Sequence, residues 1–221
     1  DWNLYLHLAL PTIVSVPANS PYKNMNELLA ALKAKPGTIS VATAGVNSSG
    51  HTAMDQIAAA TGVKYKHVTY DGGNPAVVAT VAGETEVTTQ LAPEQAEMIK
   101  AKRLRPLAVV ADQPLTIEGV GTIPPITDFV KDFPKVTTGF GIFIPKGVPP
   151  EVVATVDKLW AEKIATSDKV KKYAAEKGAL FTPLYGKAAY DAVWPTVVTD
   201  AYLLQDAGLA KVSPESVGIK R

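Results

Sequence analysis

Short β-rich runs alternate with helix-like runs from Thr12 to about Ala111, and this alternation limits the possible folds more than any other feature. Such an alternation is typical of a parallel sheet covered by helices, because each helix returns the chain to the start of the next strand. The sequence therefore predicts an α/β fold. The predicted strands are Thr12–Val16, Ile39–Ala44, Lys64–Thr69, Glu86–Thr89 and Leu104–Ala111, and the predicted helices are Met25–Lys33, His51–Thr61, Pro75–Ala82 and Pro93–Lys102.

The carboxyl-terminal part of the chain differs in composition and in the order of its predicted elements. A loop rich in Gly, Pro and Thr precedes one more predicted strand at Thr137–Pro145. Pro149 and Pro150 then open a helix, because proline is tolerated at the first helical position. A basic helix at Asp168–Lys177 and a longer helix at Lys187–Leu204 complete the predicted elements.

Composition excludes several classes of function. Lys plus Arg number 22 and Asp plus Glu 21, so a net charge of +1 gives no strong attraction to nucleic acid or to an anionic membrane. The absence of cysteine excludes disulfides, thiolate catalysis and thiolate zinc sites. His7, His51 and His67 have no helical i, i+4 spacing, and neither a phosphate-binding loop nor a dinucleotide fingerprint follows a strand. We therefore predict no metal and no cofactor.

The first segment that carries chemistry is a loop of small residues between a predicted strand and a predicted helix. A helix start presents unpaired backbone N–H groups at the positive end of its dipole, and small side chains let an anion approach them. The alternative is a tight turn in which a serine merely caps the helix. The predicted ligand-binding residues here are Gly45, Val46, Asn47, Ser48, Ser49, Gly50 and His51.

A second segment of the same kind follows the next predicted strand. Tyr70 offers a ring and a hydroxyl, and the glycines after it expose backbone; the alternative is a turn whose tyrosine only covers the sheet edge. Loops at the carboxyl ends of two strands in one sheet can face the same crevice. The predicted ligand-binding residues of this segment are Tyr70, Gly72, Gly73 and Asn74.

The alternative interpretation of the same residues is an enzyme, a serine hydrolase. A nucleophile elbow requires G-x-S-x-G, whereas Gly45 precedes Ser48 by three positions. A serine and a histidine as close as Ser49 and His51 at a helix start seldom point at each other. The sequence therefore favours a binding protein over an enzyme.

Taken together, these segments resemble the Bug, or TctC-like, family of extracytoplasmic receptors for tripartite tricarboxylate transporters. The order and spacing of the motifs carry the resemblance, which extends over most of the chain. The motifs are Pro21–Leu29, the loop ending at His51, His67–Tyr70 leading into Gly72–Ala76, Gly83–Val87, Pro93, Ile99–Val109, and Gly139–Pro145 followed by Pro149–Val153. The sequence departs from the family at Glu86, where Asp is usual, and at Thr89, where Phe is frequent. The resemblance implies that Glu86 belongs to the pocket wall, so Glu86 is added to the predicted ligand-binding residues and the pocket wall differs from the usual one.

The resemblance implies a periplasmic-binding-protein fold of the Venus-flytrap type II kind, with two lobes joined by two crossover strands. It also implies a small carboxylate ligand held by backbone amides and ordered water, delivery to membrane transporter subunits, and a periplasmic location with the export signal removed or outside this chain. A ligand-sensing regulatory domain of the same architecture is the alternative. Which carboxylate is bound stays open.

Family members carry roughly 100 further residues, about one lobe, before the position of Asp1. We therefore expect residues 18–136 to form a second, ligand-binding lobe, and residues 1–17 and 137–221 to form the crossover strands and helices of an incomplete first lobe. An incomplete lobe leaves apolar surface uncovered. We expect a second copy of the chain or a retained amino-terminal fragment to cover it.

Overall fold

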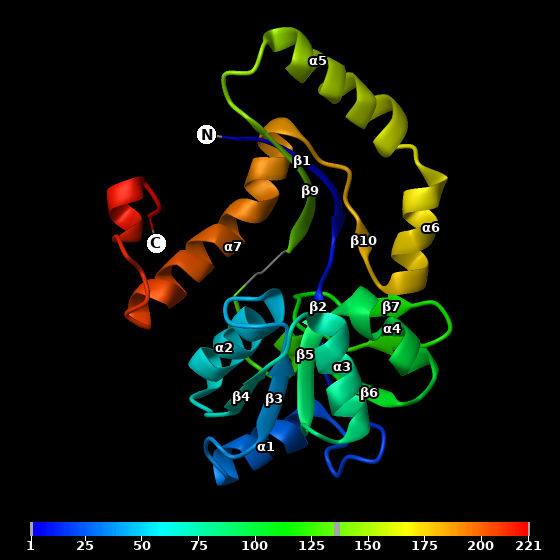
Figure 1. Cartoon of the computed structure of the whole chain (residues 1–221), viewed down its shortest axis with the longest axis vertical. Coiled ribbons are helices and arrows are strands. Elements are labelled where there is room, and N and C mark those ends of the chain that lie inside the picture. Colours follow the sequence, from blue (N-terminus) through cyan, green and yellow to red (C-terminus); the bar gives the residue numbers. More distant parts are fainter. Residues whose placement is uncertain (1, 135–137, 221) are drawn as a thin grey trace. The chain divides into compact units, whose positions relative to one another are not determined.

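The computed structural model describes residues 2–134 and 138–220, so the expected lobe boundary at Val136 and the expected strand start at Thr137 lie outside the described residues. The chain divides into two compact units (Figure 1). The continuous unit is Pro11–Lys135, and the discontinuous unit combines Asp1–Leu10 with Val136–Arg221. The chain therefore passes between the units twice.

The continuous unit is built on a five-stranded sheet with the order β4-β3-β5-β2-β6. A small hairpin of β7 and β8 completes its strands. The strands are β2 (Thr12–Pro17), β3 (Ser40–Thr43), β4 (Lys66–Thr69), β5 (Val87–Leu91), β6 (Leu104–Val109), β7 (Leu115–Ile117) and β8 (Gly121–Ile123). β4, β3 and β5 are parallel, whereas β2 pairs antiparallel with both β5 and β6.

The mixed sheet corrects two expectations. A fully parallel sheet is wrong, because β2 enters from β1 of the other unit and not through a crossover helix from a strand of the same sheet, and it runs antiparallel to β5 and β6. The expectation that Thr12–Pro17 belongs with the first lobe is also corrected, since this strand lies inside the sheet of the continuous unit between β5 and β6. A strand pattern predicts that a strand exists, but neither its direction nor its neighbours.

Four helices cover this sheet (Figure 1), and their ends follow local chemistry. Asn24 caps α1 by accepting from the amide of Glu27, and Gly62 ends α2 in the left-handed conformation, as predicted. The interior side chains Ile13, Val77 and Ile99 belong to one buried apolar cluster. The helices are α1 (Met25–Ala34), α2 (Ser49–Thr61), α3 (Gly73–Ala82) and α4 (Ala92–Lys100), with a short 3-10 turn, η1 (Ile126–Asp128).

The discontinuous unit contains a three-stranded antiparallel sheet with the order β10-β1-β9. Its strands are β1 (Trp2–Ala9), β9 (Gly139–Pro145) and β10 (Leu180–Phe181), and its helical segments are α5 (Pro150–Leu159), a π-turn η2 (Trp160–Ile164), α6 (Asp168–Lys177), α7 (Gly186–Asp206) and the 3-10 turn η3 (Pro214–Val217). The strand at residues 2–9 was not predicted.

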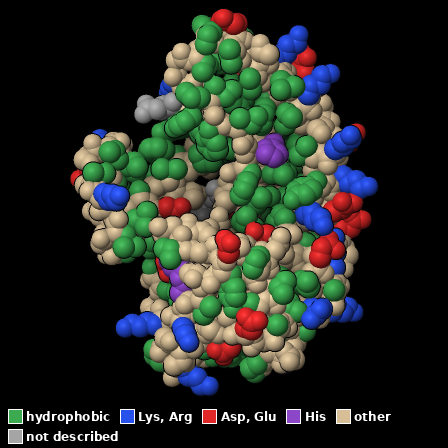
Figure 2. Space-filling view, viewed as in Figure 1, with side chains coloured by type: hydrophobic (Ala, Val, Ile, Leu, Met, Phe, Trp, Pro, Cys, Tyr) green, Lys and Arg blue, Asp and Glu red, His purple; other side chains and the backbone are tan. Residues whose placement is uncertain are grey.

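The core of the discontinuous unit is small. Tyr5 and Trp160 lie in contact within it, with ring centroids 5.4 Å apart, and the Trp160 indole donates to the Leu6 carbonyl over 2.6 Å. By contrast, α5 has no buried residue. Apolar side chains also gather on the surface of this unit (Figure 2), among them Phe140, Ile142 and Phe143 of β9.

Candidate functional site at two helix starts

The loop between β3 and α2 lies at the carboxyl end of β3. Gly45 and Asn47 adopt positive φ angles of 128° and 61°, which turn the chain sharply into the helix. The Ser48 hydroxyl caps α2 by accepting from the amide of His51 over 3.3 Å. Ser49, Gly50 and His51 form the first turn, and the exposed side chains of Val46 and Asn47 form the tip of the loop.

Two backbone donors at this helix start lack a partner. Among the described residues, the amides of Ser49 and Gly50 have no acceptor, whereas that of His51 is taken by the Ser48 cap. Gly50 is buried, and a Cβ added to it would lie 1.9 Å from the Thr89 carbonyl oxygen, so only glycine fits against β5 here. The Thr89 hydroxyl also donates to the Gly50 carbonyl over 2.8 Å. The start of α2 is therefore anchored to β5 while two of its donors stay available.

The loop between β4 and α3 forms the second helix start. α3 begins at Gly73, two residues earlier than the predicted Pro75, so Gly72 is the capping position and Asn74 lies in the first turn. The correction has a physical cause: Gly72 has a φ of 109° and allows the sharp turn before the helix. Since no side chain caps α3 and Pro75 has no N–H, its first-turn donors are the amides of Gly73 and Asn74.

The structure brings the two loops to the same end of the sheet. β3 and β4 are parallel, Thr43 pairs with Thr69, and the Tyr70 amide donates to the Thr43 carbonyl over 2.9 Å. Both helix starts therefore follow directly from adjacent strand ends. Two such starts can bind an anion through backbone N–H groups, because each helix dipole favours negative charge there.

The Tyr70 hydroxyl already has a hydrogen-bond partner within the protein. It donates to the Glu84 carboxylate over 3.2 Å. Burial, followed by this contact with Glu84, raises the pKa of Tyr70. The side chain is therefore engaged within the protein.

Glu86 is not brought together with the other predicted residues. It lies just before β5, where its carboxylate accepts from the Ser40 amide over 3.2 Å and its amide donates to the Ser40 hydroxyl over 3.0 Å. Ser40 opens β3, so Glu86 lies at the opposite end of the sheet from Thr43 and the two loops. Glu86 was predicted from its position in a family motif, and the direction of the strands separates it from the loops.

Glu94 is a charged neighbour of the site that was not predicted from the sequence. Its carboxylate accepts from the Leu91 amide over 3.1 Å at the start of α4, and a Cβ on Gly73 would lie 2.1 Å from its Oε1 atom. Burial raises the pKa of Glu94, although the Leu91 hydrogen bond opposes this rise. The start of α3 therefore already has a protein carboxylate beside it. Pro93 followed by the acidic Glu94, which is typical of the first turn of a helix, was the available signal.

The geometry gives no support to a Ser–His catalytic pair. The Ser48 hydroxyl accepts from the backbone of His51 and not from its ring, while the ring Nδ1 of His51 accepts from the Asn47 amide over 3.1 Å. No hydroxyl–imidazole bond links Ser48 or Ser49 to His51 within the part of the chain that the structure describes. Both groups serve the local structure of the loop.

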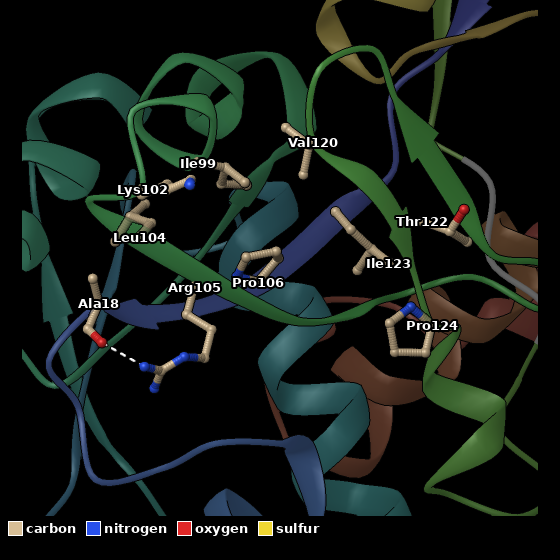
Figure 3. Close-up of a pocket in the computed structure, with 10 residues that line it drawn as sticks. All are labelled: Ala18, Ile99, Lys102, Leu104, Arg105, Pro106, Val120, Thr122, Ile123 and Pro124. Carbon is tan, nitrogen blue, oxygen red and sulfur yellow. Dashed lines mark hydrogen bonds between the residues drawn. The ribbon is translucent and has the colours of Figure 1, made fainter.

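A separate pocket of about 360 Å³ lies beside the start of β6 (Figure 3). Its two cationic side chains are Lys102 and Arg105. The Arg105 guanidinium donates to the carbonyls of Ala18, Ser20 and Tyr22, which takes up three of its five N–H donors. Because β6 begins beside the end of β2, this pocket lies at the sheet end opposite the two loops.

Comparison with known proteins decides the family. The model of the tripartite tricarboxylate transporter family receptor, TctC, matches residues 5–180, which is more than half of the chain. The chain belongs to the TctC receptor family. The predicted family resemblance is thus confirmed.

A curated relative of the TctC receptor chain is encoded in the tcbD–tcbE intergenic region of a Pseudomonas species. It is 35% identical over 167 residues, which are 75% of this chain and 49% of the relative. The chain therefore spans about half the length of this relative.

Three solved structures share the fold of this TctC receptor chain. The periplasmic binding protein BugD superposes with a TM-score of 0.74 at 21% identity, covering 94% of this chain and 69% of BugD. An R. palustris protein with adipate gives 0.73 at 21% identity, covering 96% and 68%. MatC from Rhodopseudomonas palustris, with bound malate, gives 0.72 at 19% identity, covering 90% and 66%. The predicted periplasmic-binding-protein fold with an incomplete lobe is confirmed.

No helix within residues 2–134 and 138–220 is both long and apolar enough to cross a bilayer.

Proposed function

We propose that this chain serves in a periplasmic receptor that captures a small organic carboxylate for a tripartite tricarboxylate transporter. Membership of the TctC receptor family supports the role, and BugD, a periplasmic binding protein, supports the compartment. Adipate and malate, named with two structures of the same fold, support a carboxylate ligand. The chain acts by binding and release, without catalysis.

One observation carries the ligand class. The start of α2 offers the unpaired amides of Ser49 and Gly50, anchored against β5 at the same sheet end as the start of α3. Oriented backbone N–H groups at a helix start bind an anion without a cationic side chain. The proposed site comprises the loop Gly45–His51 and the turn Gly72–Asn74.

We place the carboxylate of the ligand at α2 and not at α3. The Glu94 carboxylate lies beside Gly73 at the start of α3, so a second anion there would be repelled. No protein carboxylate contacts the amides of Ser49 and Gly50 within the described residues. Glu86 is left out of the proposed site because it lies at the other end of the sheet.

We also propose that the exposed apolar surface of the discontinuous unit has a protein partner. The candidates are a second copy of the chain and a retained amino-terminal fragment. Large apolar side chains on both faces of β9 support this, since Phe140 and Ile142 alternate with Phe143 along the strand. Contiguous apolar patches of this kind mark interaction surfaces.

The ligand site is tested by substitutions at Ser49, the first residue of α2. Ser49→Ala removes one hydroxyl donor that can bond to the carboxylate and should weaken adipate or malate binding by about 1.5 kcal/mol, roughly tenfold. Ser49→Asp places a like charge about 5 Å from the bound carboxylate, which costs about 3 kcal/mol and weakens binding more than a hundredfold. Calorimetric titration of both acids measures each Kd.

Thermal unfolding supplies the control. An acidic residue in the first turn of a helix is favourable, so Ser49→Asp should keep or slightly raise the melting temperature while it abolishes binding. Ser49→Asn, which is similar in size but neutral, should bind like Ser49→Ala. If Ser49→Asp bound either acid as tightly as the unaltered chain, the Gly45–His51 loop would not be the anion site.

A further inference from the structure

A stacked pair of histidines lies against the Gly45–His51 loop. The rings of His51 from α2 and His67 from β4 have centroids 4.0 Å apart and planes inclined by 15°. The Tyr65 and His67 rings meet edge to face with centroids 6.2 Å apart, and the Tyr65 hydroxyl donates to the Asp55 carboxylate. Asp55 in turn approaches His51 Nε2 to 3.4 Å. Within the described residues, His67 and Asp55 are therefore the titratable groups that contact the His51 ring, and Tyr65 is linked to it through these two.

The histidine pair is bonded to the loop at two points. The Asn47 amide donates to His51 Nδ1 over 3.1 Å. His67 Nε2 and the Thr43 hydroxyl are 2.6 Å apart, and the Gly45 amide donates to that same hydroxyl over 3.4 Å. The two positive-φ residues of the loop, Gly45 and Asn47, are therefore each connected to one ring of the pair.

The hydrogen bonds define the chemical form of His51 that fits. Nδ1 accepts from the Asn47 amide, so it carries no proton, and the ring hydrogen lies on Nε2, facing Asp55. A second proton on the ring would have to enter at Nδ1. It would turn the acceptor into a donor, which cannot bond to the Asn47 N–H.

Asn47 needs this acceptor. Its φ of 61° is uncommon for a residue with a side chain, and such a conformation persists only where its surroundings hold it. Its own side chain is exposed at the loop tip. The bond to His51 therefore acts together with the bond from the Ser48 amide to the Gly45 carbonyl in restraining the segment directly before Ser48 and the free amides.

We propose that His51, supported by His67, is a positioning residue that holds the anion loop in its binding shape only while Nδ1 is unprotonated, so that acidification releases Asn47 and weakens anion binding. The effect on anion binding rests on the proposed function, whereas the restraint of the loop by His51 does not. Burial, then the neighbouring His51, lowers the pKa of His67 against the opposing pull of Asp55, which agrees with a neutral His67 near pH 7. Asp55 also offsets the charge that a protonated His51 would present to an anion.

The first experiment is nuclear magnetic resonance on the 221-residue chain without ligand. At pH 7.5 the ring nitrogen shifts should identify His51 as the Nε2–H form. On acidification the Asn47 amide resonance should move together with the His51 ring. His51→Asn, whose Oδ1 atom can take the place of Nδ1, should keep the Asn47 shift and remove its pH dependence, whereas His51→Phe should lose the shift at every pH. If His51 were in the Nδ1–H form, or if His51→Phe left the Asn47 amide resonance unchanged, His51 would not restrain the loop.

The second experiment separates regulation from function. Calorimetric titration with adipate and with malate at pH 7.5 and pH 5.5 should show about fivefold weaker binding at the lower pH, the worth of one neutral hydrogen bond. His51→Asn should bind equally at both pH values. Equal Kd values at both pH values for the unaltered chain would overturn the regulatory step. If neither acid bound at either pH, the proposed function would fail. The resonance data would still show whether His51 restrains the loop.

Discussion

The continuous and discontinuous units of this chain bury their apolar side chains to very different extents. Among the described residues, all large exposed apolar side chains except Val46 and Val78 belong to the discontinuous unit. The continuous unit closes a five-stranded sheet beneath helices, whereas the discontinuous unit has a three-stranded sheet and one helix, α5, without a buried residue. Two layers around one core are the usual requirement for stability. We infer that the continuous unit is the more stable of the two.

The largest expected effect is a selective loss of the discontinuous unit. Trp160→Ala removes a buried ring that contacts Tyr5 and bonds to the Leu6 carbonyl, and such changes cost about 3–5 kcal/mol. All three tryptophans, Trp2, Trp160 and Trp194, lie in the discontinuous unit. Tryptophan fluorescence during urea unfolding should therefore report this unit alone, with a midpoint shifted to lower urea.

The matched control lies in the continuous unit. Leu32→Ala, at a fully buried position of α1, should cost about 2–5 kcal/mol and shift the far-ultraviolet circular dichroism transition while the fluorescence transition stays in place. Coincident shifts of both signals for either variant would mean that the two units unfold as one, and the comparison would fail.

A smaller effect is expected from the exposed surface of β9. Light scattering on the purified chain should give a mass above that of one copy, or mass spectrometry should find a second peptide. Ile142→Lys combined with Phe143→Lys should abolish this association with little change in stability, since both side chains are about half exposed. Val78→Lys in the continuous unit, also exposed, is the control and should have no effect. A stable monomer with no additional peptide would contradict the proposed partner.

The smallest effect concerns acid, which should weaken both units. Burial lowers the pKa of His67 in the continuous unit and of His7 in the discontinuous unit below the ordinary value of 6.5. The folded state then binds fewer protons than the unfolded state, so this stability is present above pH 6.5 and is lost as the pH falls through 6.5 toward the folded pKa. Urea midpoints at pH 8 and pH 5.5 measure the loss.

Single substitutions assign that loss to each unit. His67→Phe should flatten the pH dependence of the circular dichroism transition, and His7→Phe that of the fluorescence transition. Comparison with the unaltered chain cancels the contribution of carboxylates. A urea midpoint that rose on acidification in the unaltered chain would contradict the expected direction of the effect.

The sequence predicted the continuous unit well where local chemistry decides the structure. Alternating apolar runs located the five strands of its main sheet, and caps such as Asn24 and Gly62 fixed helix ends within a residue or two. The loop at Gly45–His51 was predictable as a helix start, because small residues between a strand and a helix leave few other structures. Whether this loop binds an anion stays a prediction.

The remaining features depend on pairing across the chain. The direction of β2 and the separation of Glu86 from the loops follow from strand register, which no local pattern encodes. Glu94 reached the site through tertiary packing against Gly73. β1 was not predicted, although Leu4, Leu6 and Leu8 alternate with other residues in a pattern that favours a strand.

The discontinuous unit also sets an order of events during synthesis. β1 pairs with β9, so Ala9 cannot pair until Gly139 has been synthesised, 130 residues later. At roughly 10 residues per second a ribosome needs about ten seconds for that stretch. During this interval the continuous unit can fold on its own contacts, whereas the apolar side chains of β1 have no partner strand. An exported chain would therefore present β1 to chaperones as an unpaired strand long before its sheet can close.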